Sequence, residues 1–310
     1  MLTTDCPVAH QTHRPAIVDG TSGAKASSIV GFPPRYPMKL QDLLATDALI
    51  PSLPEGVNLI LAELQKEEPD LRRVNQLLSG EVGLTVRILR LVNSARFSAG
   101  GQRVGTVEAA TAILGLAATR QLVQAAAVGG AFKGVPGVDM TEFWRHSLNV
   151  AKIAQSLAAD FKLDSGIAFT AGLLHGVGDL VLKMVMPDRA SLQPDFATDD
   201  NRCEAQIADL GYAYPEVGAA FASRWLFPEA IVEAIRYQCD PQDSTDQTLS
   251  SVLYLSCWSA RAHELDIEDT ALFDSFPHEV AQAIGMTDAQ RLCDDKIIEW
   301  TQADEARDFS

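Results

Sequence analysis

The sequence predicts an all-α fold with two helical lobes, a bundle at about residues 45–130 and a second lobe at about 138–262. Apolar residues recur at helical spacing in one segment after another, whereas the alternation of apolar and polar residues that favours strands is hard to find. Short breaks containing Gly and Pro separate these segments. With 310 residues, the chain is long enough to bury one large core or two modest ones.

The first lobe is predicted to contain five helices. The first opens after Pro54, because proline pre-sets the backbone for a helix start. Asp70 is a plausible N-cap for the second, the third ends near Asn93, and Gly115 closes the fourth. The apolar stripes of the five helices, in chain order, are Val57–Leu64, Leu71–Leu78, Leu84–Ala95, Val107–Leu114 and Leu122–Ala126.

The second lobe follows the pairs Gly129-Gly130 and Pro136-Gly137, which predict a boundary. Its first helix begins at Thr141, a candidate N-cap, and His146 shares one face with apolar residues at helical spacing, so we expect this histidine to point inward. The next helix carries His175. The expected ranges of the remaining helices are 167–185, 216–225, 228–237 and 249–263.

The two ends of the chain differ from the lobes. Residues 1–38 are rich in Thr, Ser, Pro and Gly and lack a periodic face, which predicts a flexible segment. Residues 263–310 are predicted to be an acidic extension, because the stretch 262–310 holds 13 acidic and 3 basic residues. Within it, helices are expected around Val280–Ile284 and Lys296–Trp300.

The charge balance argues against a nucleic-acid partner. The net charge is −16, and an acidic protein does not favour phosphate backbones. We interpret a local cluster of arginines as solvated helix faces with acidic neighbours, contact with nucleic acid being the alternative. This basic cluster consists of Arg72, Arg73, Arg87, Arg90, Arg96 and Arg103.

Cysteine usage and hydropathy predict a cytoplasmic protein. The five cysteines are widely spaced and form no CxxC pair, which fits reduced thiols. Residues 1–30 contain no continuous apolar stretch of the kind found in a secretory signal. No window is expected to approach the apolar length that a membrane span needs.

A series of short segments keeps a characteristic order and spacing. The segments are Leu53-Pro54, Arg87–Phe97, Val107–Leu116, Phe143–Ser147, Ala171–His175, Glu216–Ala220, Trp225 with Pro228, and Ile235–Tyr237 before Asp240-Pro241. Together they resemble the HDOD family, the HD-related output domain of bacterial signalling proteins, over about residues 45–262. The resemblance implies that the second lobe is HD-like and related to metal-dependent phosphohydrolases.

The same resemblance shows that metal ligands are missing. In catalytic HD enzymes, ligands come from a first His, an adjacent His-Asp pair and a distant Asp. Here His146 is the first His, and the pair survives only as His175, because Gly176 has no side chain. Two His residues and one doubtful Asp do not make a hydrolytic divalent-ion site, so no metal or cofactor is expected. The vestigial pocket comprises His146, His175, Gly176, Asp179, Gln238, Cys239 and Cys257.

Each of these residues also has a plain structural interpretation. The two histidines can be core residues that hydrogen-bond to each other or to backbone carbonyls, metal binding being the alternative. Asp179 is expected to pair with Lys183, four residues later. Cys239 and Cys257 can lie near each other as inert buried thiols, a redox role being the alternative.

The predicted function is that of a non-catalytic signalling module, a pseudoenzyme that regulates by binding a protein partner. Two alternatives stay open at this point. One is a metal-dependent phosphohydrolase with an unconventional ligand set. The other is a sensor that binds a small molecule or nucleotide in the vestigial pocket.

Overall fold

The computed structural model describes residues 38–45, 54–94, 104–132, 134–189, 199–265, 275–286, 289–293, 297–302 and 306–307. These residues form helices and contain no strand, so the all-α prediction is confirmed. All of them belong to one compact unit, residues 37–310. The N-terminal segment that was predicted to be flexible lies outside the described residues, apart from Met38.

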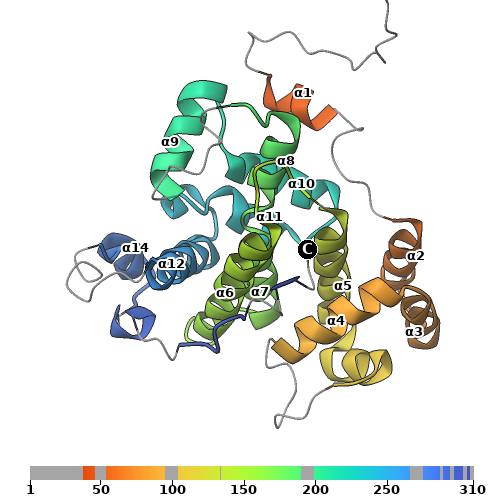
Figure 1. The fold of residues 1–310 in the computed structure, drawn as a ribbon. Coiled ribbons are helices and arrows are strands. Elements are labelled where there is room, and N and C mark those ends of the chain that lie inside the picture. Colours follow the sequence, from red (N-terminus) through yellow and green to blue (C-terminus); the bar gives the residue numbers. More distant parts are fainter. Residues whose placement is uncertain are drawn as a thin grey trace, which may run out of the picture. The chain divides into compact units, whose positions relative to one another are not determined.

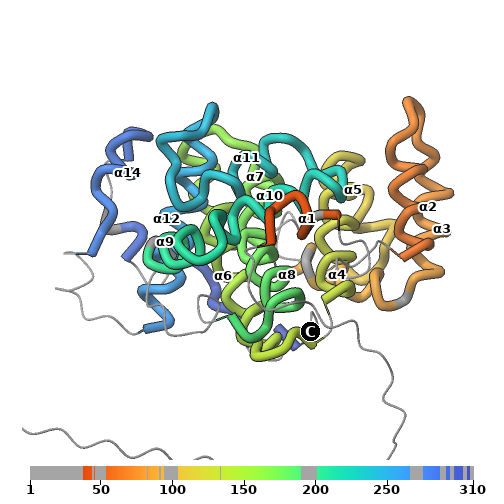
Figure 2. The backbone as a smooth tube through the Cα atoms, turned by 90° about the horizontal axis from the view of Figure 1, so that it is seen from above, coloured from red at the N-terminus to blue at the C-terminus, as the bar shows by residue number. Residues whose placement is uncertain are grey.

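The first part of the fold packs around the long helix α5 (Figure 1). Helices α2, α3 and α4 each contact α5, and in Figure 2 α2 and α3 again lie side by side at one end. Asp70 caps α3 as expected, accepting from the main-chain N–H groups of Arg72 and Arg73. These helices are α2 (Glu55–Leu64), α3 (Leu71–Gly80), α4 (Val82–Ser94) and α5 (Val107–Ala131), whereas the preceding α1 (Leu40–Ala45) contacts α10 (Tyr214–Arg224).

Gly115 divides α5 into two helical stretches. Its φ of 72° and ψ of 177° are not helical, and a positive φ is readily adopted only by glycine. The expected end of a helix at Gly115 is therefore confirmed, although the second stretch starts directly after it.

The second part of the fold is built on α6, α7 and α12, which pack against one another (Figure 1). Helices α8, α10 and α11 extend this group, α10 lying against both α8 and α11. The helices are α6 (Met140–Ala158), α7 (Ser165–Leu174), α8 (Val177–Val185), α9 (Asp199–Leu210), α10 (Tyr214–Arg224), α11 (Glu229–Arg236), the short 3₁₀ turn η2 (Pro241–Asp243) and α12 (Gln247–Glu264).

Two expectations for these helices were wrong, and one helix was not predicted. The single helix expected at 167–185 is divided into α7 and α8 at His175 and Gly176. The N-cap of α6 is Asp139, whose carboxylate accepts from two main-chain N–H groups, so Thr141 lies inside the helix. Helix α9 was not predicted, because its buried positions include polar residues and its apolar stripe is weak.

Two glycines allow helices to approach closely. A Cβ at Gly172 of α7 would lie 2.6 Å from the Cα of Ala151 on α6. A Cβ at Gly178 of α8 would lie 1.9 Å from the carbonyl oxygen of Tyr214 and 2.6 Å from the nitrogen of Gly218, both on α10. Real side chains do not tolerate such distances, so glycine at 172 and 178 sets where α7 and α8 pack.

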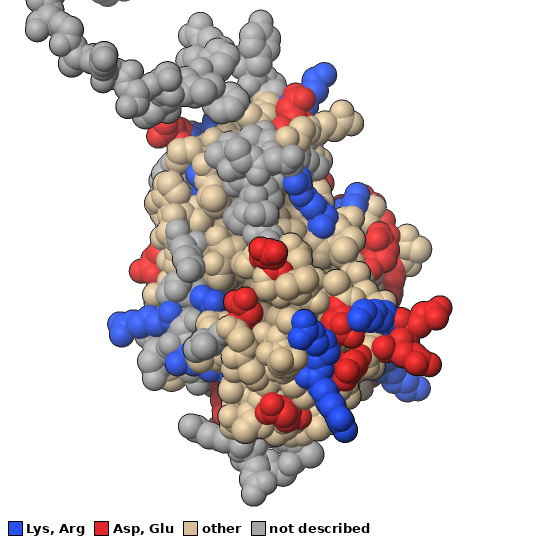
Figure 3. Space-filling model, turned by 90° about the vertical axis from the view of Figure 1, so that its right-hand side faces the viewer, with Lys and Arg blue, Asp and Glu red and all other residues tan. Residues whose placement is uncertain are grey.

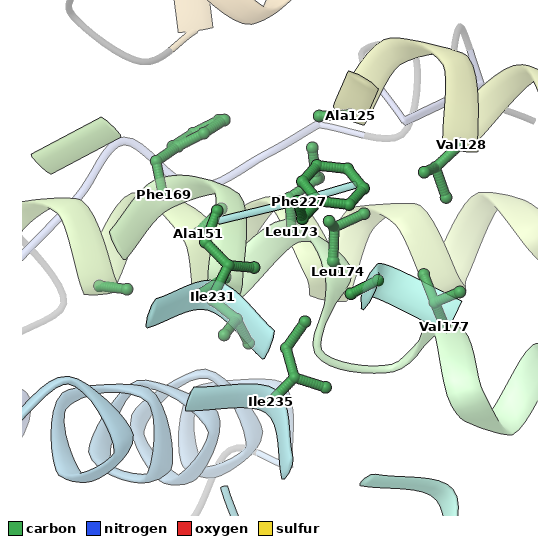
Figure 4. Close-up of a cluster of buried hydrophobic side chains, with 14 of the residues drawn as sticks. Ala125, Val128, Ala151, Phe169, Leu173, Leu174, Val177, Phe227, Ile231 and Ile235 are labelled. Carbon is green, nitrogen blue, oxygen red and sulfur yellow. The ribbon is translucent and has the colours of Figure 1, made fainter. Parts of the chain in front are cut away.

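The buried core is continuous between the two predicted lobes. Figure 4 shows Ala125 and Val128 of α5 beside Leu173 and Leu174 of α7, with Phe227 between them. Ile231 and Ile235 of α11, Val177 of α8, Ala151 of α6 and Phe169 of α7 complete the labelled cluster. The boundaries drawn between the lobes in the sequence remain predictions.

Segments of the C-terminal extension pack against the HD-like lobe. The Lys152 ammonium donates to the carbonyl oxygen of Glu299 at 3.0 Å, and the Thr301 N–H donates to Asn149 Oδ1 at 2.9 Å, so this segment crosses α6. The Trp300 ring stacks on His263 of α12, with centroids 3.5 Å apart.

The helix expected around Val280–Ile284 is confirmed as α14 (His278–Ala283). The helix expected at Lys296–Trp300 was wrong, because residues 297–300 are not helical.

Two segments among the described residues, Val107–Ala131 and Ser165–Val185, are long and apolar enough to cross a membrane by length and composition. The expectation that no window would approach this length was therefore wrong. Within the protein, 56% of the first window and 89% of the second are buried, which is typical of core helices. Gly115 and the His175-Gly176 break also interrupt the two segments.

Candidate functional site

The centre of the vestigial pocket is His175, at the break between α7 and α8. It is 2% exposed, and its Nδ1 donates a hydrogen bond to the carbonyl oxygen of Gly172 at 2.7 Å. That carbonyl belongs to the last turn of α7, where main-chain carbonyls have no partner within the helix. Nδ1 of His175 therefore caps a main-chain carbonyl at the C-terminal end of α7.

His146 faces His175 from α6. The two rings meet edge to face, with centroids 5.3 Å apart, so the inward orientation expected for His146 is confirmed. The Nδ1 atom of His146 donates to Oε2 of Glu264, the last residue of α12, at 2.9 Å. The sequence reasoning missed Glu264, because no spacing pattern connects residues 118 positions apart.

The environment of Glu264 favours its charged form. Burial by itself raises the pKa of this carboxyl, but the hydrogen bond and positive charge of His146, together with Arg145 and Arg261, lower it, and the net pKa lies below the ordinary value of 4.5. The second oxygen, Oε1, is buried and has no hydrogen-bond partner among the described residues.

The position next to His175 leaves little room for a side chain. Gly176 is the N-cap residue of α8, and a Cβ placed there would lie 3.0 Å from a ring carbon of Phe143 on α6. Phe143 in turn meets the Trp144 ring edge to face, with centroids 4.9 Å apart. An aromatic ring thus borders the volume into which an Asp at 176 would project.

Gln238 turns its amide toward the main chain. Its Nε2 donates to the carbonyl oxygens of His175 at 3.0 Å and Ile235 at 2.9 Å, and the residue is 3% exposed. It therefore ties the end of α11 to the α7–α8 break. Its Oε1 is buried without a hydrogen-bond partner among the residues that the structure describes.

Asp179 belongs to a separate polar cluster on α8. Its Oδ2 lies 2.9 Å from Nζ of Lys183, as the spacing of four residues led us to expect, and 3.7 Å from Nη1 of Arg202 on α9. Gln206 of α9 donates to Asp179 at 3.5 Å and accepts from the Tyr214 N–H at 2.7 Å. These contacts fasten α8 to α9 and to the start of α10.

The cysteine contact differs from the expected pair. Sγ of Cys239 lies 2.7 Å from Sγ of Cys203 on α9, a residue that the sequence reasoning did not place here. Cys257 is buried on α12. Its proximity to Cys239 stays a prediction.

The residues present do not fit a hydrolytic metal centre. Such centres need several imidazole and carboxylate ligands converging on one ion. Here Gly176 offers no ligand atom, and because Nδ1 of His146 bonds to Glu264 and Nδ1 of His175 bonds to a main-chain carbonyl, each histidine has only its other ring nitrogen for a metal. Within the described part of the chain, no group of three or more His, Cys, Asp or Glu side chains could hold a metal ion.

The four arginines of the basic cluster that the structure describes differ in exposure. Arg72, Arg73 and Arg90 are exposed, whereas Arg87 is half-buried against Gly130, and burial lowers the pKa of its guanidinium. On the face of the molecule seen in Figure 3, Lys and Arg side chains are mixed with Asp and Glu. Arg96 and Arg103 lie outside the described residues.

The fold is that of the HD-like helical class, and comparison with known proteins gives the family. The model of the HDOD domain matches residues 50–241. Because this match spans more than half of the chain, the protein belongs to the HDOD family.

Solved structures support the same fold. A protein of Shewanella amazonensis SB2B, described as "Putative phosphohydrolase", is 27% identical, with a TM-score of 0.68 over 86% of this chain and 98% of that one. A protein of Marinobacter aquaeolei VT8, described as "Putative signal transduction protein", is 22% identical, with a TM-score of 0.54 over 84% of this chain and 62% of that one.

An uncharacterized protein of Treponema pallidum (strain Nichols) is 27% identical over 194 residues, which are 61% of this chain. The match spans only 37% of the Treponema protein, so that protein is much longer than the shared region.

Proposed function

We propose that this protein is a non-catalytic regulatory module of a bacterial signalling pathway that acts by binding a protein partner in the cytoplasm. The observation that carries the proposal is at the α7–α8 break. Gly176, beside His175, has no ligand to offer, and the Phe143 ring restricts the space beside it. The donor atoms Nδ1 of His175 and Nε2 of Gln238 hold helix ends together.

The donor arrangement supports a structural role for the former site. Gln238 donates to two main-chain carbonyls, and His175 donates to a third. Hydrogen bonds of this kind satisfy buried main-chain groups and fix helix ends. A metal-activated water would need at least one open ligand position flanked by several anionic or imidazole ligands, and this donor set does not provide it.

Signalling is favoured by family membership and by the description of the Marinobacter structure, whereas the Shewanella description points to phosphohydrolysis. The second candidate function is therefore a phosphohydrolase. The observation that favours it is the edge-to-face meeting of His146 and His175 beside a carboxylate, because imidazole and carboxylate groups are common metal ligands.

Metal content and hydrolysis separate the two functions. The full chain is purified without chelator, and Mn, Fe, Mg, Ni and Zn are measured after gel filtration, followed by phosphodiesterase assays with Mn²⁺ or Mg²⁺ added. We expect metal well below one ion per chain and hydrolysis at background. Bound metal with hydrolysis that disappears in both His146→Ala and His175→Ala would establish the enzyme instead.

Partner binding is tested by capture from the native cell with the full chain as bait. The matched variant is His175→Ala, restricted to the fraction that is folded by circular dichroism. If the partner binds an outer surface, the folded variant retains it. A nucleotide that raises the melting temperature of the wild type and not of His175→Ala would support the sensor alternative.

A further inference from the structure

Cys203 and Cys239 bring two thiols together from separate elements. Cys203 lies on α9, and Cys239 lies between α11 and η2, so 36 positions separate them in the chain. Their Sγ atoms are 2.7 Å apart, and only a small further approach reaches the disulfide bond length of about 2.05 Å. Both side chains are thiols rather than halves of a disulfide in the structure, Cys203 buried and Cys239 partly exposed.

The surrounding contacts hold the two thiols in place. The Tyr214 hydroxyl lies 3.7 Å from Sγ of Cys239, and the Arg202 guanidinium covers the Tyr214 ring at 4.1 Å from its centroid. Arg202 precedes Cys203 on α9 and also reaches Asp179 of α8. Tyr214, at the start of α10, therefore contacts Cys239 through its hydroxyl and Arg202, the neighbour of Cys203, through its ring.

We propose that Cys203 and Cys239 form a reversible disulfide when the protein meets a hydroperoxide. Cys239, the more exposed thiol, attacks a peroxide oxygen, the O–O bond breaks, and a sulfenic acid and one water form. The sulfur of Cys203 then attacks the Cys239 sulfur, the S–O bond breaks, and a second water leaves. In total, two thiols and one hydrogen peroxide give one disulfide and two waters, and a reduced dithiol reverses the bond by exchange.

The bond would have a defined structural effect. It links α9 to the residue that follows Gln238, whose amide holds the carbonyl oxygen of His175. The loop that the disulfide closes contains α10 and α11. Closing it restricts the conformations of the unfolded chain, which stabilises the folded state. This inference does not depend on whether the domain is catalytic.

The bond is detected directly in the wild-type full chain. Reduced protein is treated with hydrogen peroxide, trapped with an alkylating agent at acidic pH and digested without reductant. Trypsin cuts after Arg202 and Arg236, and a protease that cuts before Asp separates Cys239 from Cys257 at Asp240. We expect one linked pair of peptides, containing Cys203 and Cys239, which disappears after dithiothreitol.

Four variants provide the controls. Cys203→Ser and Cys239→Ser should each abolish the linked peptides, whereas Cys257→Ser and Cys293→Ser should leave them. The wild type should melt at a higher temperature after peroxide than after dithiothreitol, and Cys203→Ser should show no such difference. Linkage of either residue to another cysteine, links only between chains, or sulfinic and sulfonic acids without a disulfide would overturn the proposal.

Discussion

Nδ1 of His146 lies 2.9 Å from Oε2 of Glu264, which joins the middle of α6 to the last residue of α12. The side chains are 18% and 11% exposed, so solvent weakens this contact less than one between exposed side chains. The contact places a carboxylate beside the two histidines, and Nδ1 of His146 is hydrogen-bonded to that carboxylate. The pair thus ties the C-terminal end of α12 to α6.

The pair predicts a loss of stability in acid. The folded pKa of Glu264 lies below 4.5, so the carboxylate contributes its full stability above pH 4.5 and loses it as the pH falls through the folded pKa. The free energy of unfolding measured in urea should therefore be higher for the wild type than for Glu264→Gln at neutral pH. In acid the two values should become equal. A difference between the two proteins that stays constant with pH would contradict the role given to this carboxylate.

Gly176→Asp is expected to destabilise the protein without creating hydrolysis. The new Cβ would lie 3.0 Å from the Phe143 ring, and the carboxylate would be buried without enough metal ligands beside it. Thermal melting and phosphodiesterase assays with added Mn²⁺ measure both effects. Adding Phe143→Ala to Gly176→Asp removes the steric contact with the ring and leaves the cost of the buried carboxylate. Metal-dependent turnover in either variant would show that the ligand set is sufficient.

His175→Ala should lower the free energy of unfolding by about 1–4 kcal/mol, because it leaves a cavity and removes the bond to the Gly172 carbonyl. The exposed residue His278 offers a matched change, and His278→Ala should cost no more than about 0.5 kcal/mol. Equal melting curves for wild type and His175→Ala would mean that His175 is not a packing residue.

Gly178→Ala should be strongly destabilising, by about 1–3 kcal/mol or more, because its Cβ would overlap the main chain of α10. Gly80, near the end of α3, has no atom within 4 Å of an added Cβ, so Gly80→Ala serves as the control and should be neutral or slightly stabilising. Denaturant unfolding of both variants checks the contrast.

Removing residues 289–310 should lower the melting temperature by several degrees. The truncation deletes the stack of Trp300 on His263, and it removes the main-chain partners of Lys152 and Asn149 on α6. Deleting residues 1–37, which hold few apolar residues, should change the melting temperature little. A larger fall in melting temperature after deletion of residues 1–37 than after deletion of residues 289–310 would mean that the N-terminal segment packs on the fold.

The sequence determined the helical class, most of the helices and the family, because these depend on local signals. Apolar spacing marks a helix face, Asp70 marks a helix start, and Gly115 marks a break, and each signal lies within a few residues of what it specifies. The absence of Asp after His175 is also visible in the sequence, so loss of a metal ligand could be predicted without the structure.

Tertiary packing decided the contacts between residues that are distant in the chain. Glu264 lies beside His146 where α12 meets α6, Cys203 beside Cys239 where α9 meets the segment after α11, and Phe143 beside Gly176 where α6 meets the start of α8. No local pattern encodes these contacts. The break at His175-Gly176 is likewise not visible in the continuous apolar run of the sequence, and in the structure α8 beyond it packs closely against α10 at Gly178.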